Sequence, residues 1–396
     1  MIILTIDTSC DDTCIAILKI KNQKSKIGDA RFDVLSNIVS SQVEVHQKYG
    51  GVYPFLAKRE HQKNLVPVLK KALRQGLRVS LSRTPHGKQK FEKPNLIAVT
   101  VGPGLEPCLW VGVNFAKALA YSWNLPIIPV NHIEAHILAN FLNTKYKILN
   151  PVRGQRSLAE AQRKQTSNGV NTKYLLPAIC LIVSGGHTQL ILMKKIGNYK
   201  IIGETRDDAA GECFDKTARI LGLGYPGGPS IAQQAAQLKL KMKNEKLKIS
   251  LPRPMINSKD YDFSFSGLKT AVLYDFKKRP ASVKTTAGKP RKEYIREMAK
   301  EIQQAIIDVL IKKTIKAAKD YRAKSIILGG GVAANKELRK QFNYKLRTIN
   351  YKLNFLVPPR KFCTDNAVMI GIAGYFNRGK ASKNWKKIKV DANLRI

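Results

Sequence analysis

Residues 2–19 read IILTIDTSCDDTCIAILK, and this stretch decides the expected fold. Two β-branched, apolar runs flank a short polar turn, which is the pattern of two buried strands joined in a hairpin. Residues 179–193, ICLIVSGGHTQLILM, repeat the arrangement around the turn SGGHT. Further apolar runs at 95–100, 127–130 and 325–328 lie near segments of helical period, which predict helices at 62–75, 109–123 and 298–319. Strands that alternate with helices predict an α/β protein, and the repeated hairpin predicts a duplicated unit with a cleft between its halves.

The composition is that of a folded and strongly basic protein. The chain has 396 residues, of which 44% are hydrophobic, so a disordered or fibrous chain is excluded and two or three domains are expected. Lysine and arginine number 69 against 28 acidic residues, a net charge of +41. Such a charge attracts phosphate polyanions, so nucleic acid is the first partner to expect, with a general lysine bias as the alternative. Six cysteines are too sparse for a disulfide scaffold.

No stretch of the sequence is long and apolar enough to suggest a membrane span. The longest uncharged apolar run, residues 175–183, is well short of the roughly 20 residues that a spanning helix needs. The first ten residues lack a basic region and include Asp7 within the apolar run, which is not typical of a signal peptide. We therefore expect no membrane partner and a cytoplasmic location.

Five segments are polar, basic and poor in residues that could form a core. We expect loops, exposed helices or tails at 70–93, 146–173, 239–253, 277–297 and 378–396. The segment 146–173 is too polar to order itself readily and is interpreted as an insertion. It is either a solvated linker or a contact with nucleic acid.

The motif HIEAH at residues 132–136 places two histidines four residues apart, on one face of a helix. This is a metal-ligand spacing, although a helix cap or a core pair is the alternative. A zinc peptidase needs glutamate directly after the first histidine, where this chain has Ile133, so peptidase chemistry is disfavoured. Asp365 is the candidate third ligand, in the first turn of a helix that Thr364 caps. The alternative for Asp365 is an acid that complements a helix dipole.

Three glycine-rich turns are candidates for holding a phosphate. They are SGGHT at 184–188, YPGGP at 225–229 and GGGV at 329–332. None has the spacing of a P-loop or of a dinucleotide-binding motif, and each alone is more often a tight turn. In a basic α/β chain the three together favour a nucleotide-like ligand.

Two acidic clusters stand out against the basic background, at residues 7–12 and 207–215. Carboxylates beside phosphate-binding turns commonly hold a cation, orient a nucleophile or contact a ribose. Turn formation is the alternative for Asp11 and Asp12. For residues 207–215 we expect a functional role, because carboxylates so close together are costly to place without a ligand.

Nine blocks of sequence, in order, resemble the bacterial TsaD family of tRNA adenosine threonylcarbamoyltransferases, long described as glycoproteases. The blocks are IDTSCDDT (6–13), YGGVYPFLAKREH (49–61), GPGL (102–105), HIEAH (132–136), VSGGHTQL (183–190), DDAAGECFDKTARILGLGYPGGP (207–229), DFSFSGLKTAV (262–272), GGGVAAN (329–335) and CTDNAVMIG (363–371). They cover nearly the whole chain, which makes the resemblance specific.

The resemblance implies two ribonuclease-H-like lobes around a central cleft, the fold of the actin, heat-shock chaperone and sugar-kinase (ASKHA) superfamily. We expect the N-terminal lobe at 1–130, joined by a C-terminal helix at 366–396. The C-terminal lobe is expected at 131–365, with basic insertions near 146–173 and 277–297.

The resemblance also implies an activity and a set of ligands. Members transfer threonylcarbamoyl from threonylcarbamoyl-AMP to the adenosine 3′ of the anticodon, in tRNAs that read codons beginning with A. By motif, His132, His136 and Asp365 would bind one divalent metal, Fe2+ in the first place and Zn2+ as the alternative. The residues implied to hold the adenylate are Ile182, Val183, Ser184, Gly185, Gly186, Asp215, Gly228 and Asn335.

Asp11 is the residue that we expect to position the attacking amine or to take its proton. Attack by a weakly nucleophilic amine builds negative charge on oxygen, so a Lewis acid and backbone donors are needed rather than a covalent nucleophile. Cys10 and Cys213 are accordingly expected to be structural. Ile182 stands where archaeal and eukaryotic relatives carry a tyrosine ligand, so open metal positions are implied.

The partners implied by the resemblance are tRNA, a TsaB-like paralogue and a TsaE-like ATPase. Three other readings stay open at this point. One is an ATPase or sugar kinase of the same fold, and another is a non-catalytic tRNA-binding scaffold. The third is a metallopeptidase, for which the usual arrangement of a general base beside the zinc water is lacking.

Overall fold

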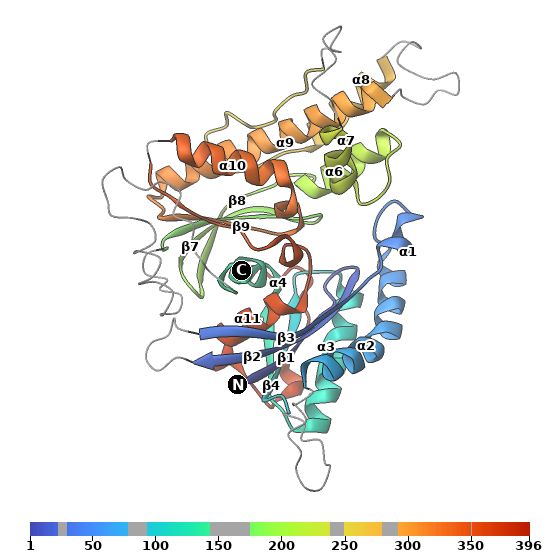
Figure 1. Cartoon of the computed structure of the whole chain (residues 1–396), viewed down its shortest axis with the longest axis vertical. Helices are drawn as coiled ribbons and strands as arrows, with labels where there is room; N and C mark the ends of the chain where they lie inside the picture. The colour runs from blue at the N-terminus through green and yellow to red at the C-terminus, as the bar shows by residue number, and fades with distance from the viewer. Residues whose placement is uncertain (23–29, 78–92, 143–174, 238–248, 279–291, 350) are drawn as a thin grey trace.

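The computed structural model describes residues 1–22, 30–77, 93–142, 175–237, 249–278, 292–349 and 351–396 (Figure 1). The predicted insertion at 146–173 and most of the one at 277–297 lie outside these ranges. So do most of the basic segments at 70–93 and 239–253. Within the described ranges, no helix combines the length and the apolar character that a membrane crossing requires.

Two five-stranded sheets of the same plan form the two halves of the molecule. The first has the strand order β3-β2-β1-β4-β5, and the second has the order β8-β7-β6-β9-β10. In each sheet the first three strands pair antiparallel and the last two are added in parallel. The strands are β1 (Ile2–Asp7), β2 (Asp12–Asn22), β3 (Ala30–Ser41), β4 (Leu96–Gly102), β5 (Ile127–Asn131), β6 (Ala178–Val183), β7 (Thr188–Lys195), β8 (Asn198–Glu204), β9 (Ser325–Gly329) and β10 (Asn354–Leu356). The repeated plan confirms the predicted fold of two ribonuclease-H-like lobes.

Ten helices are described between and after the strands. They are α1 (Val43–Gln47), α2 (Pro54–Gly76), α3 (Glu106–Trp123), α4 (His132–Leu138), α6 (Ala210–Ile220), α7 (Gly227–Ala236), α8 (Ser266–Lys278), α9 (Lys292–Asp320), α10 (Lys336–Thr348) and α11 (Ala367–Phe376). Proline in the first turn of α2 and of α3 suits their starts, because no intrahelical bond needs its missing N–H. Asn124 ends α3 in the left-handed conformation, at φ 53°.

Helices α4 and α11 lie between the two sheets (Figure 1). Residues Ala367 to Tyr375 are all buried, and α11 packs against the first sheet and against α4. One apolar cluster joins Ile3 and Ile128 of the first sheet with Ile182 of the second. The space between the sheets is therefore filled by two helices, and both of them lead to the predicted metal ligands. The predicted lobe boundaries at 130 and 365 stay predictions.

Candidate metal and nucleotide site

Helix α4 carries the two predicted histidine ligands on one face. It begins directly after β5 because the Asn131 side chain caps it, accepting hydrogen bonds from the backbone N–H of Ile133 at 2.9 Å and of Glu134 at 3.0 Å. The rings of His132 and His136 lie with their centroids 4.7 Å apart, nearly perpendicular to each other. The spacing of four residues thus has the geometry that the sequence predicted.

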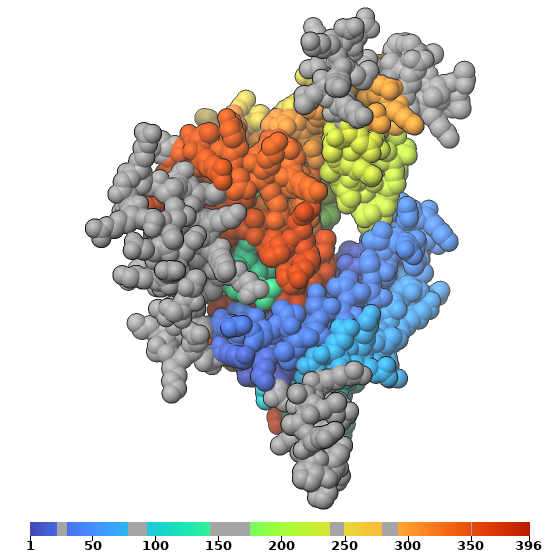
Figure 2. All heavy atoms as spheres, viewed as in Figure 1, coloured from blue at the N-terminus to red at the C-terminus, as the bar shows by residue number. Residues whose placement is uncertain are grey.

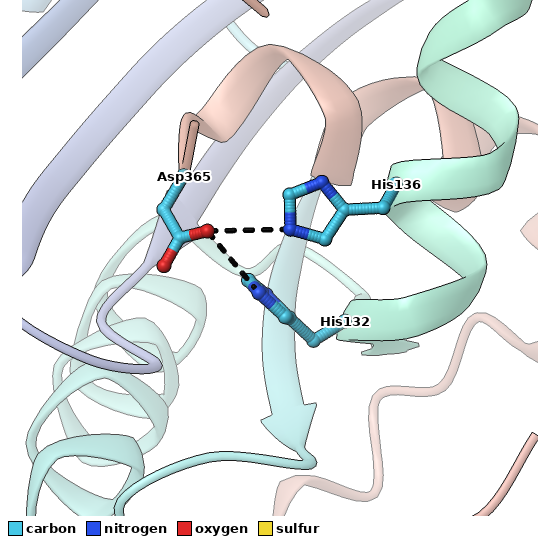
Figure 3. A group of neighbouring side chains, drawn as sticks. All are labelled: His132, His136 and Asp365. Carbon is cyan, nitrogen blue, oxygen red and sulfur yellow. Dashed lines mark ion pairs between the residues drawn. The ribbon is translucent and has the colours of Figure 1, made fainter. Parts of the chain in front are cut away.

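Asp365 faces both histidines from a different part of the chain (Figure 3). Its Oδ1 lies 3.4 Å from His132 Nε2 and 3.2 Å from His136 Nε2. The three candidate ligand atoms lie within 4.8 Å of one another. Segments more than two hundred residues apart in the chain therefore meet at one point.

The prediction that Thr364 caps the helix after Asp365 is wrong. The cap of α11 is Asn366, whose side chain accepts a hydrogen bond from Met369 N at 3.2 Å. Asp365 lies before the helix and not in its first turn. Because Asn366 satisfies the helix end, the Asp365 carboxylate is left to face the histidines.

The hydrogen bonding of the histidines fits a bound cation. Both ring nitrogens of His136 and Nδ1 of His132 are buried without a hydrogen-bond partner in the described part of the chain. Burying a polar atom without a hydrogen bond costs free energy. A metal ion between the Nε2 atoms and the Asp365 carboxylate would offset that cost. Two imidazoles and one carboxylate are a ligand set of non-haem iron(II) and of catalytic zinc.

Electrostatics tie the three side chains together. Burial would lower the pKa of His132, but the carboxylates of Asp365 and Asp7 outweigh it and raise this pKa to about 9. Burial would raise the pKa of Asp365, but His132 and His136 outweigh it and hold that pKa far below its usual range. A cation that binds here competes with the proton on His132, so its affinity should rise with pH.

Asp7 is a partner of His132 that the sequence analysis did not assign. It ends β1, and its buried Oδ2 lies 3.6 Å from His132 Nδ1. Its Oδ1 accepts a hydrogen bond from Ser9 N at 3.1 Å. A ligating histidine usually directs its second nitrogen at a carboxylate or carbonyl, which sets the ring orientation. Asp7 is the carboxylate that Nδ1 of His132 faces, at ion-pair rather than hydrogen-bond distance.

Glu134 lies on a different face of α4 from the histidines. Its Oε1 accepts a hydrogen bond from the Tyr199 hydroxyl at 3.0 Å, and its Oε2 accepts one from Asn377 Nδ2 at 2.8 Å. The carboxylate is buried and fully engaged. It is therefore not placed to act as the base of a peptidase.

Two glycine-rich turns meet at the carboxyl ends of the parallel strands β6 and β9. A Cβ on Gly330 would lie 2.3 Å from the Val183 carbonyl oxygen, and its φ of +86° also favours glycine. Gly185 and Gly186 have open space on the side where a Cβ would lie. Ligands of open α/β sheets bind at this edge. Ile182 itself has a buried side chain in β6.

The other predicted adenylate residues lie on the helices that follow. Asp215 Oδ1 accepts a hydrogen bond from Gly227 N at 2.7 Å, and burial raises the pKa of Asp215 to about 6. Gly228 has open space beside it. The Asn335 side chain caps α10 and also donates to Gln303, so its polar atoms already have protein partners.

The expectation that the whole acidic cluster at 207–215 needs a ligand is wrong. Asp207 accepts hydrogen bonds from the backbone N–H of Phe265 and Ser266, at 2.7 and 3.2 Å. Asp208 is 2.7 Å from Lys216 Nζ and 3.5 Å from Lys269 Nζ. Backbone N–H groups and lysines thus pair with the Asp207 and Asp208 carboxylates. Of the three aspartates, Asp215 is the one that lies beside a glycine-rich turn.

Asp11 lies in the turn between β1 and β2. Burial raises the pKa of Asp11, and the nearby Asp365 carboxylate raises it further. Cys213 is buried in the apolar core of the second half, as expected of a structural cysteine.

Sequence comparison covers the whole chain. The family TsaD, described as tRNA N6-adenosine threonylcarbamoyltransferase, matches residues 33–164 and 151–372. A protein of that description from Thermomicrobium roseum is 44% identical over 408 aligned positions, covering 100% of this chain and 96% of the relative. The one from Thermosipho africanus is 41% identical over 396 positions and all of both chains. The chain belongs to the tRNA N6-adenosine threonylcarbamoyltransferase family.

Membership of this transferase family confirms the resemblance seen in the nine blocks. A solved structure of full-length HypF, in a phosphate- and nucleotide-bound form, is also similar. It aligns with 97% of this chain and 47% of its own, with a TM-score of 0.50 and 12% identity. At that identity the likeness concerns the fold alone.

Proposed function

We propose that this protein transfers threonylcarbamoyl from threonylcarbamoyl-AMP to the adenosine 3′ of the anticodon, in tRNAs that read codons beginning with A. Membership of the transferase family over the whole chain carries the proposal. The net charge of +41 suits a tRNA substrate. The reaction would take place in the cytoplasm.

His132, His136 and Asp365 would hold one divalent ion, Fe2+ in the first place and Zn2+ as the alternative. Two observations support this assignment: both imidazole Nε2 atoms face one Asp365 oxygen, and neither histidine has a hydrogen-bond partner for its Nδ1 in the described part of the chain. Ile182 has an aliphatic side chain and adds no ligand, so coordination positions stay open to substrate. Bound there, the ion supplies Lewis acidity for the oxygen on which negative charge develops.

The glycine turns would hold the adenylate. The open space beside Gly185, Gly186 and Gly228 supports close approach of their backbone to a ligand. We assign the turn Ile182–Gly186, which includes Val183 and Ser184, to the phosphate, and Asp215 to the ribose. Because the Asn335 side chain caps α10, we assign it to holding the turn before that helix in place.

Asp11 would orient the adenosine amine and accept its proton. A carboxylate whose pKa is raised by burial is a stronger base than an exposed one, which suits proton transfer near neutral pH. Loss of that proton accompanies attack on the carbamoyl carbon and departure of AMP. Backbone donors near the phosphate then stabilise the leaving group.

A TsaB-like paralogue and a TsaE-like ATPase would be the protein partners. An open apolar groove between α2 and α3 supports docking of another protein on the first half. Its volume is about 760 Å³, and its lining includes Phe55, Val66, Trp110 and Phe115. Phe55 is 66% exposed, which a partner would reduce.

The test is transfer from preformed threonylcarbamoyl-AMP to an unmodified tRNA transcript, with and without the partner proteins, followed by nucleoside analysis. We expect the modified adenosine with the full chain, and its loss in Asp365→Ala and in Asp11→Asn. Asp33→Asn is the matched control, because this surface carboxylate on β3 pairs only with Lys21 and Arg31 within the described ranges. Metal content is measured on the same samples.

Two results would contradict the proposal. ATP hydrolysis without transfer under any condition would favour a kinase or ATPase. Binding of tRNA without transfer, even with partners present, would favour a scaffold. Full transfer by Asp11→Asn would remove only the role given to Asp11.

A further inference from the structure

Two exposed tyrosines stack on each other in the loop between α1 and α2. Tyr49 is 61% exposed and Tyr53 is 54% exposed. Their ring centroids lie 6.0 Å apart, and the ring planes differ by 25°. A contiguous pair of exposed aromatic side chains indicates a binding surface more strongly than single apolar residues do. We call this pair the tyrosine platform.

The tyrosine platform is connected by hydrogen bonds to the turn that carries Asp11. Tyr53 N donates to His46 Nδ1 at 3.3 Å, and His46 Nε2 lies 3.0 Å from Gln42 Oε1. Gln42 N in turn donates to the Asp11 carbonyl oxygen at 3.1 Å. His46 and Gln42 are buried. The platform therefore has a defined position relative to Asp11.

The opposite half of the molecule also supports the platform. Arg219 of α6 donates a hydrogen bond to the carbonyl oxygen of Gly50, the residue after Tyr49. Helix α1 lies at the end of the first half nearest α6 (Figure 1), and the surface is hollowed between these two regions (Figure 2). The loop that carries the platform therefore borders the hollow between the two halves. Because the loop is held from both sides, little conformational entropy is lost when a ligand binds.

Basic residues outnumber acidic ones in α1, the loop and the first two turns of α2, where Glu44 is an exposed acid without an ion pair in the described ranges. Lys48, Lys58 and Arg59 form no ion pair with any carboxylate in the described ranges. Glu60 is already paired, its Oε1 lying 2.6 Å from Lys63 Nζ. Aromatic faces beside unpaired cations are the combination with which proteins bind single-stranded nucleic acid.

We propose that Tyr49 and Tyr53 form a stacking platform for an unpaired base of the anticodon loop of tRNA. Stacking there would hold the loop open beside the hollow, so that the neighbouring adenosine reaches Asp11. Bases in a duplex have no free face, so the platform would distinguish a loop from a paired stem. The inference rests on the proposed function for the identity of the RNA, and on the geometry of the pair for the stacking.

The test compares the binding of two RNAs to the full chain at one fixed salt concentration. One RNA is a hairpin with the anticodon arm of a substrate tRNA, and the other is a duplex of the same length. We expect Tyr49→Ala/Tyr53→Ala to bind the hairpin about tenfold more weakly, the size expected for loss of one base–aromatic stack. Duplex binding should change less than about twofold. Tyr49→Ala alone should give a smaller loss in the same direction.

Matched controls separate stacking from other effects. Tyr49→Phe/Tyr53→Phe keeps the ring faces and should bind the hairpin as the wild type does. Tyr344→Ala removes a tyrosine of 65% exposure from α10 and should change nothing. Thermal unfolding of each variant confirms that the fold is intact.

Several outcomes would contradict the proposal that the tyrosine platform stacks a base. Unchanged hairpin binding by the double alanine variant would do so, and so would an equal loss for hairpin and duplex. A loss of protein-partner binding with hairpin binding intact would assign the surface to a protein. Threonylcarbamoyl transfer by the wild type is measured separately. If the double alanine variant selectively loses hairpin binding but the wild type shows no transfer, the stacking proposal stands and the proposed reaction is wrong.

Discussion

Asn131 links the helix of the two histidines to the C-terminal segment, and its substitution gives the most direct test of how the site is built. Its Oδ1 caps α4, while its Nδ2 donates to the carbonyl oxygens of Leu394 and Arg395 at 3.3 and 3.4 Å. Asn131→Ala removes both kinds of contact. Loss of a cap costs about 1 kcal/mol. The two longer bonds add less, so we expect the free energy of unfolding to fall by about 1–2 kcal/mol.

The same change should weaken the metal site. His132 is the first residue of α4, so fraying of the uncapped turn would move its ring away from Asp365. Loss of a group that orients a ligand commonly costs about 10–100-fold in metal affinity, and we expect the lower end of that range. Urea unfolding of the metal-free protein and calorimetric titration with zinc measure the two effects.

Asn131→Ser is the matched variant. Serine also caps helices, so it should recover most of the stability and of the zinc affinity that alanine loses. It cannot reproduce the donation to Leu394 and Arg395. If the alanine variant unfolds and binds zinc as the wild type does, or if serine and alanine are equally impaired, the cap does not position the histidines.

Three further changes test other contacts. Asp7→Asn should weaken zinc binding by about 10–100-fold, because the group that orients His132 loses its charge; unchanged affinity in calorimetric titration would contradict this. Burial raises the pKa of Asp215 to about 6, above the value of about 4 in an unfolded chain. The folded state therefore binds the proton more tightly, so the stability of the wild type relative to Asp215→Asn should fall as the pH rises from about 4 to about 6. Urea unfolding between pH 4 and 8 measures it, and a constant difference would refute it. Gly330→Ala should lower the free energy of unfolding by about 2 kcal/mol or more, because residue 330 has a φ of +86° and the new Cβ would meet the Val183 carbonyl oxygen. Gly331→Ala is the control, since open space lies beside Gly331, and it should lower the free energy of unfolding by less than about 1 kcal/mol. Equal effects on thermal unfolding would contradict that reasoning.

Much of the fold could be predicted from the chain because apolar strands and helical periods are local signals. The hairpin at 2–19 and the helices at 62–75, 109–123 and 298–319 were predicted on this basis, and they correspond to β1, β2, α2, α3 and α9. Three strands were missed: β3 and β8, which come third in chain order in their sheets, and the short β10. Only three of the 12 residues of β3 and one of the seven residues of β8 are buried, so neither β3 nor β8 shows a continuous apolar run.

The candidate site was predictable in part for a similar reason. His132 and His136 are linked by helical spacing, which a sequence displays directly. The contact between His132 and Asp7 depends on the register of β1 beside β4 and β5, and sequence spacing carries no information on it. The same holds for the cap of Asn366, since Thr364 and Asn366 are both good caps and only the backbone decides between them. The pairing of Asp208 with Lys216 follows from two turns of helix that an acidic cluster alone does not reveal.

Helix α11 has a consequence for how the protein is made. One apolar face of the first sheet is covered by α4 and α11, and α11 lies near the C-terminal end of the chain. While a ribosome is still translating the second sheet, α11 has not been made, so only α4 is available to cover that face. Asp365 has not yet been added either. The N-terminal half cannot finish folding as an independent unit during synthesis. The nascent chain therefore exposes apolar surface for most of its elongation. Chaperone engagement of stalled nascent chains should therefore persist until residue 376 has left the exit tunnel.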